Sequence, residues 1–314
     1  MRTFLLKRLP SGLLVLVLAS FLVFLILRLI PGDPATTLAG PDATPATVEA
    51  IRNRLGLDQP LFGQYASWLG RVLTGDLGPS YAIGGQVSDL IGNGLGATVQ
   101  LTLGALLLVV LIGLPLAVAG ATTRRRPVAA AVQAVTTGVL AIPPFVTGVL
   151  LVLLFAVSFE LLPAGGHESL LAEPDLAVQY LAMPAVCLAL PSAAVLARYL
   201  RDGVERALAE DYVRTATALG VSRRRIVWLH ALPNALPSAV TVLGLQIGHL
   251  IAGAVLVERI FAWPGLGQLI EQGVVRRDYP VVQDLLLLVV AVYVAVQLLT
   301  DLAYTWLDPR IRWE

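Results

Sequence analysis

The sequence is poor in charge. Of its 314 residues only 14% are charged and 57% are hydrophobic, and the mean hydropathy is +0.79. A soluble domain usually contains about 25% charged residues. This composition therefore excludes an ordinary soluble domain and indicates a polytopic membrane protein. The net charge of +1 gives no overall bias toward nucleic acid.

Lysine and cysteine are almost absent. Lys7 is the only lysine among 22 basic residues, and a phosphate-binding P-loop needs a lysine after G-x-x-x-x-G, so the chain is not itself a P-loop ATPase. A single cysteine, Cys187, excludes an internal disulfide and a cysteine-cluster metal site. The three histidines do not form H-E-x-x-H and no G-x-S-x-G occurs. We therefore expect no catalytic residues and no metal ligands.

Long uncharged stretches dominate what is present. A membrane-crossing helix needs about 20 mostly apolar residues, and these stretches predict six such helices, near 9–30, 98–121, 129–158, 178–200, 236–257 and 281–302. The predicted fold class is an all-α polytopic membrane protein. With the N-terminus in the cytoplasm, 15 of the 22 basic residues fall inside. The excess of basic residues on the cytoplasmic side predicts that both termini are cytoplasmic.

This topology divides the chain into four parts. Residues 1–30 form the cytoplasmic N-terminal end and the first span, and residues 31–97 form an external segment rich in glycine and proline. Residues 98–302 form the transmembrane core, which includes one large cytoplasmic loop at 201–235. Residues 303–314 form a cytoplasmic tail.

Five residues within the spans are candidates for lining a pathway. Pro143 and Pro144, followed by Phe145, interrupt the third span, where the freed backbone groups need protein or water as partners. Gln246 and His249 lie one turn apart in the fifth span, and polar side chains at this depth usually face the bundle interior or a water-filled path. The alternatives are a simple kink and an interhelical hydrogen bond. No carboxylate lies near the middle of a predicted span, which argues against ion-coupled transport.

Three further features lie in or next to the predicted external loops. The segment FAWPGLGQLI at 261–270 is expected to be either a re-entrant turn or an interfacial aromatic anchor. Glu258 is expected to form an exposed ion pair with a nearby arginine. The pair His167 and Glu168 is expected to be solvated.

The cytoplasmic loop has the periodicity of an amphipathic helix. Apolar residues recur at helical spacing on one face: Val204, Leu208, Tyr212, Ala216 and Leu219. Gly220 suits the left-handed position that ends a helix, and Ser222 suits the N-cap of a second helix through Arg223. The apolar stripe must be buried against lipid, the inner ends of the spans or a partner. A loop that only lies at the membrane interface is the alternative.

The same loop resembles the cytoplasmic signature E-A-A-x-x-x-G-x9-I-x-L-P of permease subunits in ATP-binding-cassette (ABC) importers. Gly220 falls on the signature glycine and Ala216 on its second alanine, and His230, Leu232 and Pro233 follow at the I-x-L-P positions. Arg214, Thr215 and His230 depart from the signature, and R-T-A in place of E-A-A resembles the variant of dipeptide and oligopeptide permeases. The resemblance implies that residues of this loop couple to an ATPase subunit: Glu210, Asp211, Tyr212, Arg214, Ala216, Leu219, Gly220, Val221, Ser222, Arg223 and Arg224.

Further segments resemble the B-type subunit of peptide permeases, at 6–35, 55–80, 257–270, 276–283 and 307–312. This resemblance implies a type I ABC importer permease fold in a bacterial inner membrane, and a non-catalytic subunit that forms half of a peptide pathway. It implies four kinds of partner: a second homologous permease, two ATPase subunits or domains that use ATP and Mg, an extracytoplasmic substrate-binding protein, and the lipid bilayer. The chain itself would bind no cofactor. Nickel and glutathione permeases share the pattern and remain alternatives, as does a stand-alone secondary carrier.

Overall fold

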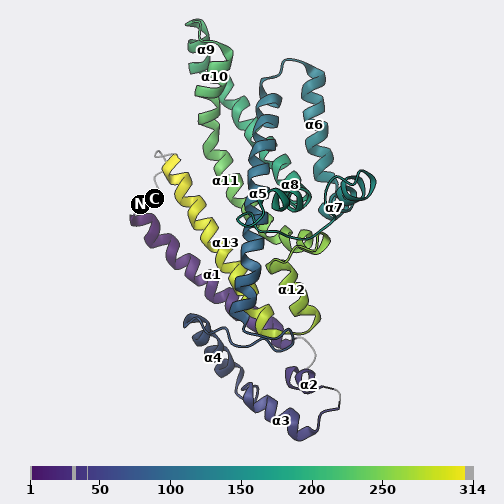
Figure 1. The fold of residues 1–314 in the computed structure, drawn as a ribbon. Helices are drawn as coiled ribbons and strands as arrows, with labels where there is room; N and C mark the ends of the chain where they lie inside the picture. Colours follow the sequence, from purple (N-terminus) through teal and green to yellow (C-terminus); the bar gives the residue numbers. More distant parts are fainter. Residues whose placement is uncertain (1, 30–32, 41, 308–314) are drawn as a thin grey trace. The chain divides into compact units, whose positions relative to one another are not determined.

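The computed structural model describes residues 2–29, 33–40 and 42–307, which fold into helices with one isolated antiparallel bridge between Pro79 and Gln86 (Figure 1). These residues divide between two compact units. Unit 1 contains residues 1–97 and 264–295, and unit 2 contains residues 98–263 and 296–314. The sequence, in contrast, predicts a single transmembrane core over residues 98–302.

Five helical stretches are long and apolar enough to cross a membrane: Arg8–Leu29, Val87–Thr122, Pro174–Ala209, Arg223–Ile260 and Tyr279–Ala303. A sixth candidate is a bent pair of helices, Arg126–Ala141 and Pro144–Ser158. Counted as one span, this pair completes the six predicted spans, and each predicted span overlaps one of these stretches.

Unit 1 is assembled from short helices around the ends of long ones. It contains α1 (Arg2–Leu29), α2 (Pro34–Ala39), α3 (Pro45–Arg54), α4 (Leu61–Leu73), the start of α5 (Val87–Thr122), α12 (Leu266–Val275) and the start of α13 (Tyr279–Leu307). Its main apolar cluster joins α5, α12 and α13 through Val87, Leu266, Leu269, Val281 and Leu285. A second contact joins α1 to α4, where the Phe24 and Trp68 rings stack with their centroids 6.3 Å apart.

The second span begins earlier than predicted, at Val87 and not near residue 98. The sequence between them contains Gly92, Gly94 and Gly96, which resembles a loop. Of these three, only Gly94 is closely packed, whereas Gly92 and Gly96 have open space at the Cβ position. A Cβ atom on Gly94 would lie 3.2 Å from the backbone of Gly265 and 3.3 Å from Leu266, at the start of α12.

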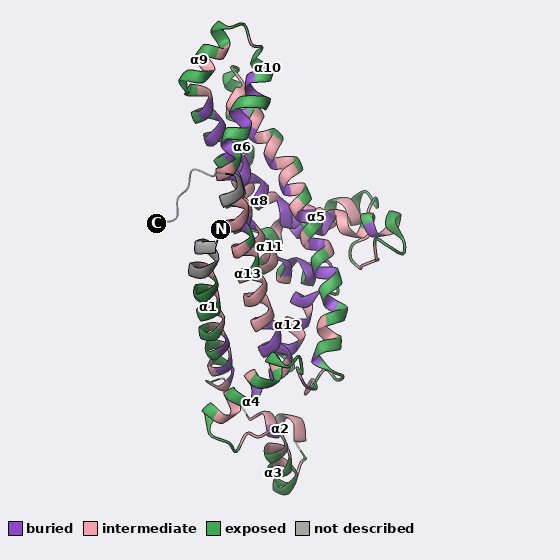
Figure 2. Cartoon of the chain, turned by 90° about the vertical axis from the view of Figure 1, so that its left-hand side faces the viewer, coloured by how far each residue is buried: buried purple, intermediate pink, exposed green. Residues whose placement is uncertain are grey.

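Unit 2 is built on one long helix pair. In it α8 (Pro174–Ala209) packs most extensively against α11 (Leu232–Ile260) and also against α6 (Arg126–Ala141) and α7 (Pro144–Leu151). Figure 2 shows that the buried residues of this unit are concentrated along α8 and α11. Many of them are alanines, and small side chains let transmembrane helices approach closely. The only cysteine, Cys187, is buried in α8 and donates a hydrogen bond to the Pro144 carbonyl at 3.2 Å.

The third predicted span is broken and not merely kinked, so the expectation of one helix over 129–158 is wrong. The axes of α6 and of the segment Pro144–Ser158 differ by 100°. Ile142 and Pro143 both have extended backbone, with ψ values of 123° and 141°. Two successive prolines cause this, because each lacks an N–H and each disfavours helical backbone in the residue before it. The second half continues from α7 into the π-helical segment η1 (Val152–Ser158).

Candidate functional site

The predicted cytoplasmic loop, residues 201–235, contains two short helices between α8 and α11. The helix α9 (Asp211–Ala218) follows α8, and α10 (Arg223–Ile226) continues through the π-helical segment η2 (Val227–Ala231) into α11 (Figure 1). The prediction of one helix from Val204 to Leu219 is wrong, because Glu210 has extended backbone with ψ 153° and separates α8 from α9. Val204 is buried on the packed face of α8, whereas α9 has no buried residue to hold it in line.

The end of α9 confirms the prediction for Gly220. Its φ is +81°, in the left-handed region. The Val221 N–H bonds to the Ala216 carbonyl and the Gly220 N–H to the Thr217 carbonyl, both at 3.0 Å, which together form a Schellman motif. Ser222 has the extended backbone of an N-cap, but its side chain makes no capping hydrogen bond. Gly220 thus sets the angle between α9 and α10.

The apolar side chains of α9 are largely uncovered. Leu219 is 78% exposed and Tyr212 is 37% exposed, whereas Ala216 is partly buried. Figure 2 shows α9 and α10 mainly in the colour of exposed residues. The Tyr212 hydroxyl accepts a hydrogen bond from Asn234 Nδ2 at 3.2 Å, which links α9 to α11. The long helices therefore bury Val204 but leave Tyr212 and Leu219 exposed, so lipid or a partner remains to cover the α9 end of the predicted stripe.

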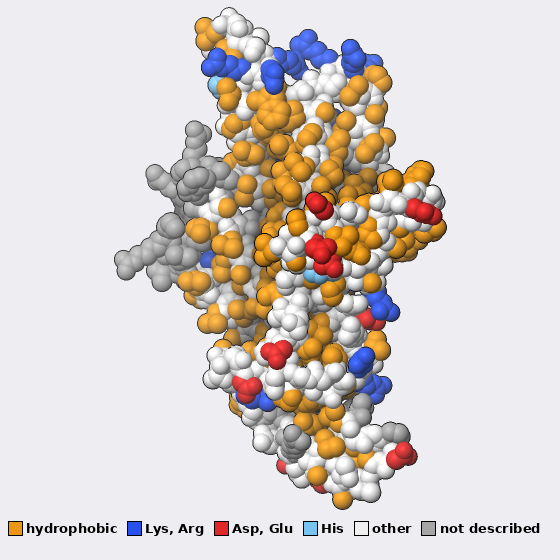
Figure 3. Space-filling view, viewed as in Figure 1, with side chains coloured by type: hydrophobic (Ala, Val, Ile, Leu, Met, Phe, Trp, Pro, Cys, Tyr) orange, Lys and Arg blue, Asp and Glu red, His pale blue; other side chains and the backbone are white. Residues whose placement is uncertain are grey.

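Arginines surround this element. Arg223 donates to the Thr122 carbonyl at the end of α5 at 3.2 Å, and Arg214 pairs with Asp211 at 3.1 Å on the surface. Arg224 lines a shallow hollow together with Trp228. Figure 3 shows basic side chains gathered over this end of unit 2. The surface combines positive charge with exposed apolar groups, as protein interfaces often do.

Three of the five pathway candidates come together in unit 2. Pro144 from α7 and Gln246 and His249 from α11 line one cavity of about 330 Å³, and α8 supplies a further wall that includes Ser192. Gln246 is buried and His249 is exposed. The other two candidates, Pro143 and Phe145, are exposed and do not line this cavity.

Glu258 is not the exposed residue that the sequence suggests. It is 0% exposed, and its Oε1 accepts a hydrogen bond from Thr98 Oγ1 at 2.6 Å. The expectation of an exposed ion pair is wrong because Thr98 is 160 positions away in the chain, and no local pattern links the two. A buried carboxylate is tolerated only with such partners.

The aromatic segment and His167 are also more buried than expected. Phe261 and Trp263 lie inside unit 2, so the interfacial-anchor interpretation is wrong. His167 packs edge-on against Trp263 with 4.7 Å between ring centroids, and its Nε2 lies 3.2 Å from Gln100 Oε1. Burial lowers the pKa of His167, although Glu168 acts in the opposite direction. Within the described ranges, no group of three or more His, Cys, Asp or Glu residues is arranged to hold a metal ion.

Comparison with known proteins identifies the family. Residues 110–313 match the family described as binding-protein-dependent transport system inner membrane component, and residues 1–102 match the N-terminal region of such membrane components. A probable peptide ABC transporter permease of Sinorhizobium fredii is 38% identical over 313 residues, with 100% of both chains covered. A probable D,D-dipeptide transport system permease of Escherichia coli is 40% identical over 321 residues, covering 95% of this chain and 94% of that protein.

Two further similarities bear on substrate and fold. A glutathione transport system permease of Salmonella choleraesuis is 38% identical over 315 residues, with 100% of both chains covered. The structure is similar to a chain of the MetNI methionine ABC transporter in an inward-facing conformation, with a TM-score of 0.59, 21% identity, and 70% of this chain and 96% of that chain covered. The chain therefore belongs to the family of inner membrane components of binding-protein-dependent transport systems, and its fold is that of ABC importer permease subunits.

Proposed function

We propose that this chain is the permease subunit of an ATP-driven peptide importer and forms half of the translocation pathway. The relatives named for peptide and D,D-dipeptide transport support a peptide substrate. As a family member the chain is a membrane component and not a catalyst. We infer that ATP and Mg are used by two ATPase subunits or domains. A second homologous permease completes the pathway, and an extracytoplasmic binding protein delivers the ligand.

The observation that carries this proposal is the connection between the exposed α9–α10 element and the cavity. The helix that ends directly before α9 supplies Ser192 to the cavity wall, and the helix that continues from α10 supplies Gln246 and His249. About 27 Å of helix separates Ser192 from Glu210, at 1.5 Å per residue. A partner that moves α9 and α10 therefore acts on both cavity walls through the helices.

We propose that this element lies in the cytoplasm, where the ATPase subunits are. Ten arginines occur in two segments of unit 2, three at Arg124–Arg126 and seven from Arg198 to Arg225. An excess of basic residues favours the cytoplasmic side. Both termini are then cytoplasmic, in a bacterial inner membrane.

Purification tests the proposal directly. A tagged copy extracted from its own membranes in mild detergent should carry stoichiometric partners, which mass spectrometry identifies. We expect a second permease and P-loop ATPases, and a binding protein where it stays attached. Recovery of the chain alone, together with transport into liposomes without ATP, would instead support a secondary carrier.

The cavity provides a second prediction. Gln246→Leu keeps the side-chain size but removes its amide from the cavity, and we expect substrate uptake to fall about threefold or more, since losing one hydrogen bond costs about 1 kcal/mol. The measurement is uptake at limiting substrate, with ATP hydrolysis followed in parallel. Leu245→Met is the matched control, because Leu245 is exposed on the same helix and does not line the cavity. Equal uptake by the Gln246 variant and the control would show that the Gln246 amide does not contribute to the translocation pathway.

Glutathione is the second candidate substrate, since a glutathione permease matches this chain with the same coverage. Competition between labelled dipeptides and glutathione for uptake by the intact complex distinguishes the two. Inhibition by dipeptides alone supports the peptide assignment.

A further inference from the structure

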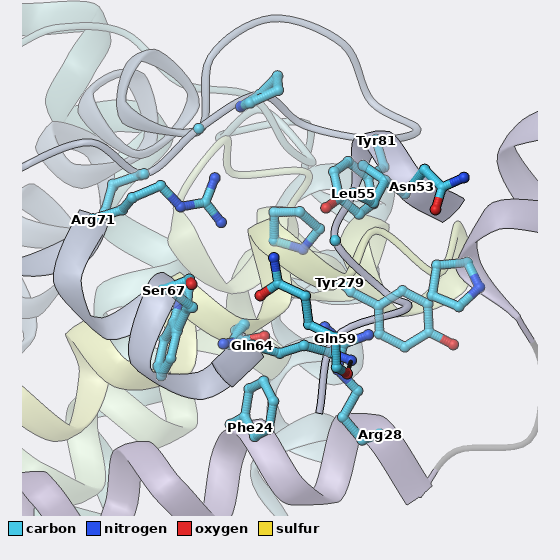
Figure 4. A pocket seen from close by; sticks show the side chains of 18 residues that line it. Phe24, Arg28, Asn53, Leu55, Gln59, Gln64, Ser67, Arg71, Tyr81 and Tyr279 are labelled. Carbon is cyan, nitrogen blue, oxygen red and sulfur yellow. Dashed lines mark hydrogen bonds between the residues drawn. The ribbon is translucent and has the colours of Figure 1, made fainter. Parts of the chain in front are cut away.

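A polar cavity of about 360 Å³ lies in unit 1 (Figure 4). Its walls come from the end of α1, from α4, from the start of α13 and from the segments 53–59 and 77–81, with Pro34 at the start of α2. It is distinct from the cavity in unit 2, and none of the candidate pathway or coupling residues lines it. Its lining is mainly polar and aromatic, which differs from the apolar surfaces of the spans.

The cavity is positively charged. Arg28 and Arg71 are its only charged lining residues, and Figure 4 shows both guanidinium groups in the view of the pocket. Among the described residues neither forms an ion pair. Arg28 lies over the Phe24 ring, 5.3 Å from its centroid. The lining contains no carboxylate, so the charge of the two arginines favours an anionic occupant.

Three carboxylates of unit 1 lie outside the lining. Asp33 pairs with Arg52, and Asp278 accepts hydrogen bonds from the segment 80–83. Asp284 accepts a hydrogen bond from Trp68 Nε1 at 2.8 Å through Oδ1, and its Oδ2 has no hydrogen-bond partner among the described residues. The two arginines therefore have no carboxylate partner at salt-bridge distance within unit 1 as described.

Two side chains of the lining carry buried polar atoms without a hydrogen-bond partner in the described structure. Gln283 lines the cavity and is only 7% exposed, and its Nε2 makes no hydrogen bond within the described structure. Gln64 Oε1 is a buried acceptor that also has no hydrogen-bond partner within the described structure. A buried polar atom without a partner destabilises the folded state. An occupant with both an anionic oxygen and a hydroxyl group would satisfy the donor and the acceptor.

Tyr81 adds a neutral donor. Burial raises the pKa of its hydroxyl, although Arg71 and Arg28 act in the opposite direction. The hydroxyl therefore stays protonated at physiological pH and is able to donate to an anion. Together with the two arginines and Gln283, it gives the cavity four side chains that donate hydrogen bonds.

The level of the cavity along the spans indicates the source of the anion. Arg28 lies in the last turn of the first span, and Tyr279 and Gln283 lie in the first turns of the last span. The wall helix α4 exposes Leu61, Phe62 and Leu73. Span ends with aromatic and basic residues lie at the headgroup level of a bilayer, and exposed apolar side chains on a short helix suit the same interface.

We propose that this cavity binds the headgroup of an anionic phospholipid, with Arg28 and Arg71 holding its phosphate and Gln283 and Gln64 bonding to its polar groups. The chemistry that the cavity recognises is a phosphate oxyanion next to a hydroxyl group. A phosphoglycerol headgroup has both. Bound lipid would tie α4 and the external segment to the ends of the first and last spans.

Lipid retention by the purified complex tests the proposal. The complex is reconstituted in nanodiscs with equal amounts of phosphatidylglycerol and phosphatidylcholine, extracted, and examined by native mass spectrometry. We expect retained phosphatidylglycerol, and about tenfold less of it in the double variant Arg28→Gln/Arg71→Gln, since both charged hydrogen-bond donors to the phosphate are removed. Arg276→Gln is the matched control, because Arg276 is an exposed arginine of the same unit outside the cavity.

Two further arms keep the test decisive. Gln283→Glu changes no size and brings a negative charge into the lining, so it should also lose the lipid if the double variant does not assemble. Soluble glycerol phosphate is the competitor. If glycerol phosphate displaces the lipid at a concentration equal to that of the lipid, the cavity binds the soluble anion and the lipid proposal is wrong. If both variants retain as much phosphatidylglycerol as the wild type, the cavity is not the binding site.

Discussion

Replacing Gly220 with valine is expected to lower substrate uptake about tenfold or more while the complex still assembles and hydrolyses ATP. Gly220 has a φ of +81°, and a Cβ there would meet no atom within 4 Å. The penalty is therefore conformational, about 1–2 kcal/mol for an L-residue in left-handed backbone and larger for a β-branched one. Since α9 has no buried residue, the strain is expected to change the angle between α9 and α10 and leave the fold intact.

The chain contains a close control for this prediction. Gly75 also has a φ of +81° and open space around its Cβ position. It ends α4 with the same pair of bonds, from Gly75 N to Val72 O and from Asp76 N to Arg71 O. Gly75→Val thus introduces similar strain outside the proposed coupling element, and uptake should stay within about twofold. Gly220→Asn should keep most activity, because asparagine tolerates this conformation.

The two measurements are ATP-driven uptake into proteoliposomes and ATP hydrolysis by the same preparation. Unchanged uptake by Gly220→Val would remove the coupling role of this turn. An equal loss in Gly75→Val would show that strain at any such turn disables the protein.

Asp278→Asn is expected to give the largest loss of stability in unit 1, about 3 kcal/mol. Asp278 is 0% exposed. Its carboxylate accepts hydrogen bonds from the Ser80 hydroxyl and from the backbone N–H groups of Tyr81, Ala82 and Ile83, at 2.5–3.1 Å. An asparagine amide would direct its own N–H groups at some of these donors, so the segment 80–83 would lose its anchor.

The pH dependence of this contact has a definite sign. Burial raises the pKa of Asp278, but the hydrogen bonds from Ser80, Ala82, Tyr81 and Ile83 outweigh it and the net pKa is lowered. A lowered carboxyl pKa in the folded state stabilises the protein above the ordinary value of about 3.9, and this stability is lost as the pH falls through the folded-state value. The wild type should therefore lose stability in acid, and Asp278→Asn should show less of this dependence.

Thermal unfolding of the purified complex and limited proteolysis of the external segment measure both effects. Asp76→Asn is the matched control. Asp76 is exposed in the same region and accepts one hydrogen bond, from the Gly78 N–H at 3.0 Å. Its loss should cost about 1 kcal/mol or less. Equal destabilisation by the two variants would mean that the buried hydrogen bonds of Asp278 stabilise the protein no more than the single exposed bond of Asp76 does.

The features that could be predicted from the sequence are those with a local signature. Apolar length predicted the spans, and the left-handed turn at Gly220 followed from glycine at the end of a periodic stretch. The consecutive prolines Pro143 and Pro144 indicated a disturbed third span. The prolines break the helix, but the 100° angle itself was not predicted, because it also depends on how α6 and α7 pack against α8.

The features that were missed depend on contacts between distant parts of the chain. Gly94 looks like a loop residue until α12 is packed against it. Glu258 looks exposed until Thr98, 160 positions away, donates to it. The periodic stretch from Val204 to Leu219 predicts one helix, yet only its first part is held by packing on α11. Periodicity identifies an apolar face but not the surface that covers it.

The buried thiol of Cys187 has a practical consequence for studying this transporter. The side chain is enclosed in α8 and bonded to the Pro144 carbonyl, and it is the only cysteine of the chain. A membrane-impermeant maleimide therefore has no exposed native target, and the natural sequence can serve as the background for single-cysteine labelling. A cysteine introduced at exposed Leu219 in the proposed coupling element, or at exposed Phe62 in α4, would then be the labelled site, and a spin label there would follow the motion of that position during turnover.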